Sequence, residues 1–178
     1  MQTRFEEIGE SDVERLADWF PRHTWPYHAQ PRVDERWVRE SVAAGAFFGS
    51  DVKSFWVLAA DGWSLAVGRV FDLADVTPLV DLRVADQARG QGVGTATLRW
   101  LTQFVFETFP ETQRLGGYTR YDNLPMRQLF KKCGFIQEAY HRKSWRMDSG
   151  ALADSVGFAI LRVDWLSGIS TPLPWSLS

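Results

Sequence analysis

Hydrophobic and polar residues alternate in several short stretches of the chain, a period typical of β-strands with one buried face. Asp61 and Gly62 separate two of these stretches and predict a tight hairpin turn. Pro78 opens another stretch, at a position where a strand tolerates a missing N–H group. The alternation predicts strands at 3–8, 54–60, 64–73, 78–84, 114–119, 138–147 and 154–163, of which the last two form a closing hairpin.

Apolar residues recur every three or four positions in other stretches, and the flanking residues are those that begin and end helices. Ser11 and Glu14 match a capping box, Asn123 matches an N-cap, and Gly45 and Gly134 are typical of helix C-termini. The pattern predicts four helices, at 11–20, 33–45, 94–109 and 123–135.

These strands and helices follow one another without an internal repeat or a linker, which predicts one domain over residues 1–178 with an irregular tail at about 168–178. The fold class is therefore α+β with a mixed sheet. Hydrophobic residues make up 45% of the 178 residues and charged residues 24%, values typical of a globular protein. The net charge of −2 argues against a nucleic-acid partner, which normally faces a basic surface.

Cysteine and histidine are scarce in the chain. Cys133 is the single cysteine, so an internal disulfide framework is excluded and a reducing, cytoplasmic location is expected. No apolar stretch of about 18 residues predicts a membrane span, and the first ten residues lack the order of a signal peptide. His23 and His28 are separated by a poor metal-ligand spacing, so no metal site is expected.

The stretch ARGQGVGTATLRWL, residues 88–101, places three glycines in five positions directly before a predicted helix. Unpaired backbone N–H groups and the positive end of a helix together attract an anion, such as a phosphate. A nucleotide-binding Walker A loop is excluded because the chain contains no Gly-Lys pair. A dinucleotide fingerprint fits poorly, because Thr95 stands where its last glycine belongs and several predicted antiparallel strands precede the loop.

The segment Arg89-Gly90-Gln91-Gly92-Val93-Gly94 matches the pattern Arg/Gln-x-x-Gly-x-Gly/Ala and resembles the acyl-CoA loop of the GNAT N-acetyltransferase superfamily. A second stretch, DNLPMRQLFKKCGF, is similar to a later helix of that family, with Asn123, Lys132, Gly134 and Phe135 in register. The resemblance spans nearly the whole chain and is most specific over 78–136, the expected acyl-CoA-binding core. The ending FAILRVDW and the Trp-rich opening loop resemble the branch of ribosomal-protein alanine and serine N-acetyltransferases.

The resemblance implies a mostly antiparallel sheet of about seven strands, flanked by about four helices, whose central strands splay apart around acetyl-CoA or another acyl-CoA. The glycine loop would grip the pyrophosphate, and the strand ending at Val84 would pair with the pantetheine arm. The residues implied in cofactor binding are Leu82, Arg83, Val84, Arg89, Gly90, Gln91, Gly92, Val93, Gly94, Thr95, Asn123 and Phe130.

Asp81 occupies the place where many GNAT enzymes carry the acidic residue that removes a proton from the acceptor amine. The alternative is a structural Asp that pairs with an arginine. Phe130 stands where much of the family has a tyrosine that acts as general acid, so either another group protonates the leaving thiolate or the thiolate leaves unprotonated.

The acceptor is expected to be an amine, either of a small molecule or of a protein N-terminus. Aromatic residues of the first loop and of the closing hairpin are the candidates for its pocket, namely Trp25, Tyr27, His28, Tyr140, His141 and Trp145. The leading hypothesis is an acyl-CoA-dependent N-acyltransferase, and the alternative is a catalytically silent acyl-CoA-binding regulatory module. Exposed edge strands make a homodimer possible.

Overall fold

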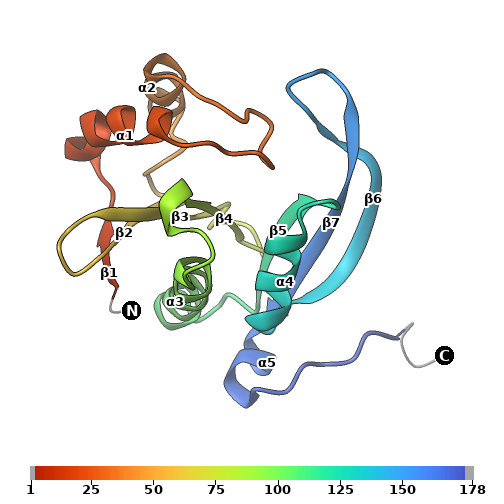
Figure 1. Cartoon of the computed structure of the whole chain (residues 1–178). Helices are drawn as coiled ribbons and strands as arrows, with labels where there is room; N and C mark the ends of the chain where they lie inside the picture. The colour runs from red at the N-terminus through yellow and green to blue at the C-terminus, as the bar shows by residue number, and fades with distance from the viewer. Residues whose placement is uncertain (1–2, 175–178) are drawn as a thin grey trace.

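The strands form one mixed sheet in the order β1-β2-β3-β4-β5-β7-β6 in the computed structural model, which describes residues 3–174 (Figure 1). Adjacent strands are antiparallel except for β4 and β5, which are parallel. Among the described residues the strands are β1 (Arg4–Glu7), β2 (Val52–Leu58), β3 (Ser64–Phe71), β4 (Leu79–Val84), β5 (Arg114–Arg120), β6 (Ile136–Arg146) and β7 (Leu152–Leu161).

The parallel strands β4 and β5 meet only at their beginning. Leu79 lies opposite Gly116, whose N–H donates to the carbonyl of Pro78 at 2.9 Å, and no later pair of the two strands is in register. β4 stays paired with β3 along its whole length, whereas β5 follows β7. The sheet therefore opens at its centre, and the expected splay of the central strands is confirmed.

Helices cover both faces of this sheet. Figure 1 shows α1 and α2 on the same side of β2 and β3, with α3 on the opposite side and α4 beside β5. The described helices are α1 (Val13–Trp19), α2 (Glu35–Ala43), α3 (Val93–Thr108), α4 (Leu124–Lys132) and α5 (Arg162–Ser167), with short 3-10 turns at Glu10–Asp12, Phe20–Arg22 and Asp86–Ala88. None of the helices within 3–174 is long and apolar enough to cross a membrane.

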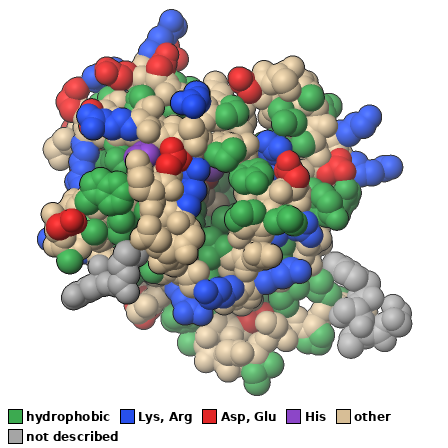
Figure 2. All heavy atoms as spheres, in the orientation of Figure 1, with side chains coloured by type: hydrophobic (Ala, Val, Ile, Leu, Met, Phe, Trp, Pro, Cys, Tyr) green, Lys and Arg blue, Asp and Glu red, His purple; other side chains and the backbone are tan. Residues whose placement is uncertain are grey.

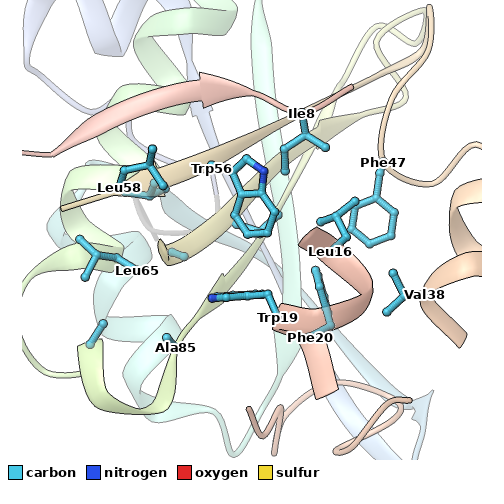
Figure 3. Close-up of a cluster of buried hydrophobic side chains, with 14 of the residues drawn as sticks. Ile8, Leu16, Trp19, Phe20, Val38, Phe47, Trp56, Leu58, Leu65 and Ala85 are labelled. Carbon is cyan, nitrogen blue, oxygen red and sulfur yellow. The ribbon is translucent and has the colours of Figure 1, made fainter. Parts of the chain in front are cut away.

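An aromatic cluster fastens α1 and the loop after it to one face of the sheet (Figure 3). Trp19 and Trp56 pack edge to face, with ring centroids 5.6 Å apart. Each indole also has a hydrogen-bond acceptor: Trp19 Nε1 donates to the carbonyl of Ser64 at 3.1 Å, and Trp56 Nε1 donates to Asp12 Oδ1 at 2.9 Å. These directional contacts fix where the chain enters the loop that follows α1.

On the other face, α3 and α4 pack against the central strands. The approach is close because strand glycines leave room: a Cβ at Gly68 would lie 2.8 Å from Thr97 Cγ2, and a Cβ at Gly117 would lie 2.6 Å from Phe130 Cζ. Phe130 is fully buried and stacks on Phe158 with centroids 4.9 Å apart. Because these glycines of β3 and β5 have no side chain, both helices can pack close to the sheet beside the splay.

Two local predictions from the sequence are wrong. Ser11 is not an N-cap, because a 3-10 turn precedes α1 and the carboxylate of Asp12, not the hydroxyl of Ser11, accepts the N–H of Gly9 at 3.0 Å. The strand predicted at 154–163 ends at Leu161, where Arg162 begins α5 and donates to the carbonyls of Phe106, Phe109 and Thr112. The described residues therefore contain five helices rather than about four.

Other predicted elements are confirmed with shifts of a few residues at their ends. Asp34 caps α2 by accepting the N–H of Trp37 at 2.8 Å, and Gly45, with φ of +75°, lies just beyond its end. Asn123 caps α4 by accepting the N–H of Met126 at 3.2 Å. The expected irregular tail at 168–178 is described as far as residue 174, and its last four residues lie outside the described part.

Candidate functional site

The glycine loop turns the chain sharply into α3. Gly90 and Gly92 have φ of +75° and +84°, in the left-handed region that glycine adopts without strain, and a Cβ on either would meet no atom within 4 Å. The first hydrogen bond of α3 runs from the N–H of Ala96 to the carbonyl of Gly92 at 3.0 Å. The N–H groups of the first helical turn therefore have no acceptor within the helix and face the open space beside the loop.

Arg89 holds the loop in place. Its Nε donates to the carbonyl of Val84 at 3.1 Å, and its Nη2 donates to the carbonyl of Thr24 and lies 2.8 Å from Asp86 Oδ1. Asp86 in turn accepts the N–H and the hydroxyl of Thr24. Burial alone raises the pKa of Asp86, but these hydrogen bonds and Arg89 outweigh it and lower the pKa. The arginine thus acts as a clamp between β4, the loop after α1 and the glycine loop.

The edge of β4 that faces the splay carries main-chain groups with no strand partner beyond Leu79, and of these the carbonyl of Val84 accepts from Arg89. Neighbouring residues of a strand direct their N–H and C=O groups to opposite edges. The carbonyl of Pro78 faces β5, and the N–H of Ala85 donates to Leu65 next to β3 at 2.9 Å. By alternation, the main-chain groups of Leu82 and Val84 face the splay, where β5 has already turned away. An extended ligand can pair with this edge as an added strand.

A cavity of about 560 Å³ joins the glycine loop to this strand edge. Figure 2 shows the molecular surface hollowed between the side that carries α1 and α2 and the side that carries α4, with hydrophobic and basic side chains around the hollow. We call it the first cavity; it is lined by Trp25, Pro26, Tyr27, His28, Leu82, Arg83, Val84, Ala88, Arg89, Gly90, Gly92, Gly94, Thr95, Asn123, Pro125, Met126, Gln128, Leu129 and Lys132.

The donors of the first cavity suit an elongated ligand that carries phosphate. The helix end and the glycine N–H groups lie at one end, and Lys132 adds a positive charge from the last turn of α4. Gly94 allows the start of α3 to pack closely against Leu129 and Leu82. A Cβ at Gly94 would lie 3.1 Å from Leu129 Cδ2 and 3.5 Å from Leu82 Cδ2. The pyrophosphate and the extended arm of coenzyme A fit this combination of anion site and free strand edge.

Asp81 lies on β4 within a cluster of charged side chains. Its Oδ1 is 3.0 Å from His28 Nε2, and its Oδ2 is 3.4 Å from Arg69 Nη2 and 3.7 Å from Arg83 Nε. Burial by itself raises the pKa of Asp81, but the charges of Arg69, His28 and Arg83 and the hydrogen bond from His28 lower it well below its usual value. Asp81 is therefore ionised and holds the imidazole of His28 by one nitrogen.

A second cavity of about 500 Å³ lies beside this cluster. His28 and Arg83 line both cavities, so the two are separated by little more than these side chains. The second cavity is lined by His28, Ala29, Gln30, Trp37, Arg69, Phe71, Leu79, Val80, Asp81, Arg83, Tyr118 and Trp145.

Most of the residues predicted for cofactor binding line the first cavity, but three do not. Phe130 is buried in the core, the side chain of Val93 is buried beneath α3, and the amide of Gln91 donates to the carbonyl of Gln87 at 2.6 Å. Val93 and Gln91 can therefore contribute only main-chain groups. Asn123 does line the first cavity, although its side chain is already used to cap α4 and to donate to Thr119 Oγ1 at 2.8 Å.

The residues predicted for the acceptor pocket are divided between the cavities. Trp25, Tyr27 and His28 line the first, and Trp145 lines the second together with His28. Tyr140 lines neither: it is half exposed on the edge strand β6, and its hydroxyl donates to Asp154. The structure gives no support for a role of Tyr140 in the pocket.

Arg69 is the most informative residue that the sequence analysis missed. It faces Asp81 directly in the register of β3 and β4, so the correct pairing of these two strands would have revealed it. Seven residues separate the strands, however, and a connection of that length leaves the register open. The other wall residues that were missed, such as Trp37 and Tyr118, come from distant parts of the chain.

The sequence matches the model of the acetyltransferase (GNAT) family over residues 11–135. No curated protein is significantly similar in sequence. A chimera of the Vibrio cholerae spermidine N-acetyltransferase SpeG and hSSAT superposes with a TM-score of 0.79 at 15% identity, covering 93% of this chain and 99% of that chain.

Two other solved structures have the same fold. The spermidine N-acetyltransferase from Vibrio cholerae in complex with CoA and spermine superposes with a TM-score of 0.78 at 15% identity, covering 93% of this chain and 98% of that one. A probable acetyltransferase gives a TM-score of 0.74 at 19% identity, with coverage of 92% and 94%. With the family match and a site that suits coenzyme A, the chain belongs to the GNAT acetyltransferase family and is an N-acetyltransferase that uses acetyl-CoA.

Proposed function

We propose that the protein transfers an acetyl group from acetyl-CoA to a primary amine of a small molecule or a protein N-terminus, by direct attack of the amine on the thioester. One observation carries this proposal: a single cavity joins the N-terminus of α3, the unpaired edge of β4 and the imidazole of His28. An anion site, a docking strand and a proton acceptor are thus adjacent, as the transfer requires.

The first turn of α3 and the glycine loop would hold the pyrophosphate. Each backbone N–H that donates to an ionised phosphate contributes about 1.5–3 kcal/mol, and the helix end adds about 1 kcal/mol. Gly90 and Gly92 leave the space that a Cβ would occupy to the ligand. Lys132 adds an attraction that salt can screen.

The free edge of β4 would align the pantetheine arm. Leu82 and Val84 offer the main-chain groups that face the splay, although the carbonyl of Val84 already accepts from Arg89. An N–H on this edge, that of Leu82 or Val84, would donate to the thioester oxygen and stabilise the negative charge that develops there. Acetyl-CoA supplies the activated acetyl group.

His28 is the group best placed to accept the proton of the amine, with Asp81 as its positioning partner. The low pKa of Asp81 makes this carboxylate a poor proton acceptor. Its hydrogen bond to His28 Nε2 instead leaves Nδ1 of the imidazole free to act as a base at the boundary of the two cavities. An α-amine, with a pKa of about 7.7–8.0, needs less help from such a base than a lysine amine at about 10.4.

Phe130 has no part in this reaction scheme, because it is buried behind β5 and lines neither cavity. A thiolate is a stable leaving group, since a thiol has a pKa of about 8.5, so departure of coenzyme A does not require a tyrosine at that position.

The proposal is tested by following the release of free thiol from acetyl-CoA with a panel of amino acids, polyamines and short peptides, while calorimetry measures the binding of acetyl-CoA. We expect binding without an acceptor and thiol release only when a suitable amine is present. Binding of acetyl-CoA with no release for any acceptor would contradict the proposed transfer. The cytoplasmic location and the homodimer stay predictions.

A further inference from the structure

The walls of the second cavity carry an excess of positive charge. Two guanidinium groups, of Arg69 and Arg83, face a single carboxylate, that of Asp81. The remaining titratable side chains of the wall are His28 and Tyr118. Both oxygens of Asp81 are already engaged, Oδ1 by His28 and Oδ2 by the two arginines. The cavity therefore offers an incoming ammonium group no free carboxylate but offers an anion two cations.

Three N–H donors on this wall lack an acceptor. Arg69 Nε, Arg83 Nη1 and Trp145 Nε1 are buried and have no hydrogen-bond partner within the described part of the chain. Buried donors of this kind are costly to leave unpaired, and native proteins seldom do so without a functional reason. Of the seven such side-chain atoms among the described residues, three belong to residues of β3, β4 and β6 that line this one cavity.

The two arginines are held in place before any ligand binds. The guanidinium of Arg83 lies over the rings of Trp25 and Trp37, at 5.3 and 5.6 Å from their centroids. Arg69 Nη1 donates to the carbonyl of Ala46 at 2.6 Å, and its guanidinium lies 5.3 Å from the centroid of Phe71. Fixed guanidinium groups recognise a carboxylate with little loss of side-chain freedom.

We propose that the second cavity is the acceptor site and that it recognises an anionic group, so that the acceptor is an amine that also bears a carboxylate, such as an amino acid. This inference rests on the proposed function and names its substrate class. Arg69 and Arg83 bind the carboxylate, and the aromatic wall of Trp37, Phe71, Tyr118 and Trp145 encloses the apolar part of the acceptor. His28, which lines both cavities, receives the amine at the boundary with the first.

This assignment separates the chain from the structural relative that was solved with spermine. A polyamine carries several ammonium groups and requires several free carboxylates. The second cavity, by contrast, has a volume of about 500 Å³, within the range of small-molecule sites, and a positive balance of charge.

The decisive experiment compares ligands that cannot react. N-acetylphenylalanine and N-acetylphenylalaninamide share their shape and lack a free amine, but only the first carries a carboxylate. Calorimetry with the full chain in the presence of coenzyme A should give at least tenfold tighter binding of the acid than of the amide, and weaker binding of spermine than of the acid. Equal binding of acid and amide, or tightest binding of spermine, would overturn the inference.

Variants assign the preference to the arginines. Arg69→Gln should reduce the preference for the acid to less than threefold, whereas Arg69→Lys should retain part of it because the charge remains. Arg36→Gln is the matched control: Arg36 pairs with Glu40 on the exposed face of α2 and should leave the preference unchanged. A full preference in Arg69→Gln would overturn the assignment to Arg69. If that variant does not fold, Arg69→Lys and the comparison of ligands on the unaltered chain still decide the question.

Thiol release measured in parallel distinguishes the two proposals. If the acid binds selectively but no amino acid or other amine releases thiol, the proposed transfer fails and the anion site stands. If spermidine releases thiol faster than every amino acid in the panel, the transfer stands and the carboxylate-bearing acceptor is wrong.

Discussion

The two cavities on either side of His28 differ in the kind of chemical group that each offers to a ligand. The first takes its main-chain groups from the stretch of chain that runs from β4 through the glycine loop into α3, and residues of the loop after α1 and of α4 complete its wall. The second is made of side chains from β3, β4, β5, β6, α2 and the loop before α2. A main-chain site needs only small residues and a helix end, whereas a side-chain site needs particular residues brought together by the fold.

The two cavities also differ in their charges, which include partial charges of the main chain in the first and are full charges of side chains in the second. The first cavity attracts an anion with partial charges at the end of a helix, which carry no large desolvation cost. The second contains the ionised group of Asp81 between two arginines, and such a cluster is stable only while every charge keeps its partner. Changes in the first cavity should therefore affect ligand binding with modest effects on folding, while changes in the second should affect both.

The largest effect is expected at the boundary of the two cavities. His28→Gln should lower kcat by about 10²–10⁴-fold, the usual contribution of a general base, while changing the Kd for acetyl-CoA by less than tenfold. His141→Gln, on β6 and outside both cavities, is the control in the same thiol-release assay and should retain kcat. Unchanged kcat in His28→Gln would remove His28 from the mechanism.

Asp81→Asn should destabilise the fold by about 3–5 kcal/mol at neutral pH, because it leaves Arg69 and Arg83 without their shared counter-charge. Since folding lowers the pKa of Asp81, its stabilisation is complete above the unfolded-state pKa of about 3.9 and is lost as the pH falls through the folded-state value. The difference from the unaltered chain should therefore narrow below about pH 4.

Urea unfolding at neutral and acid pH measures this difference. Asp18→Asn is the control, because Asp18 pairs with Arg22 on the exposed surface, and such pairs contribute less than about 1 kcal/mol. Equal stabilities of Asp81→Asn and Asp18→Asn at neutral pH would show that the buried cluster does not depend on the Asp81 charge.

Gly92→Val should weaken acetyl-CoA binding by about a hundredfold, the loss of one or two charged hydrogen bonds, because the new side chain enters the space beside the helix end. Gly62→Val is a close control. Gly62 has φ of +88°, similar to the +84° of Gly92, and also has open space around it, but it lies in the turn between β2 and β3.

Both valine variants should lose about 1–3 kcal/mol of stability through backbone strain, as thermal or urea unfolding will report. Calorimetry should show weaker binding of acetyl-CoA only in Gly92→Val. If the two variants bind acetyl-CoA equally well, the glycine loop is not its site.

The smallest effect concerns two adjacent lysines of α4. Lys132→Ala should weaken acetyl-CoA binding by about three- to tenfold at low ionic strength, and the effect should fade at high salt because the charge lies near the surface. Lys131→Ala removes the same charge from a residue that does not line the first cavity and should change the affinity by less than twofold. Equal losses in both variants would indicate a general effect of net charge on binding.

The two cavities also differ in how much of each could be predicted from the sequence. The glycine loop was predictable because its signals are local: a strand, three glycines and a helix pattern follow one another within residues 78–109. Asp81 was recognised by its distance from that loop, but its partners were not, because Arg69 is found only when the register of β3 and β4 is known. Tyr140 was misplaced because the closing hairpin contains register shifts, which alter the side to which its residues point.

The sequence by itself determined the α+β fold and the glycine loop that leads into a helix, since periodicity, capping and glycine placement act over short distances along the chain. Its match to the family model over residues 11–135 shows the membership in the acetyltransferase family. Only the tertiary structure decided that His28 meets Asp81, that two arginines share one carboxylate, and that Phe130 lies in the core. These contacts join residues up to 53 positions apart, and packing and strand register, rather than local preference, bring them together.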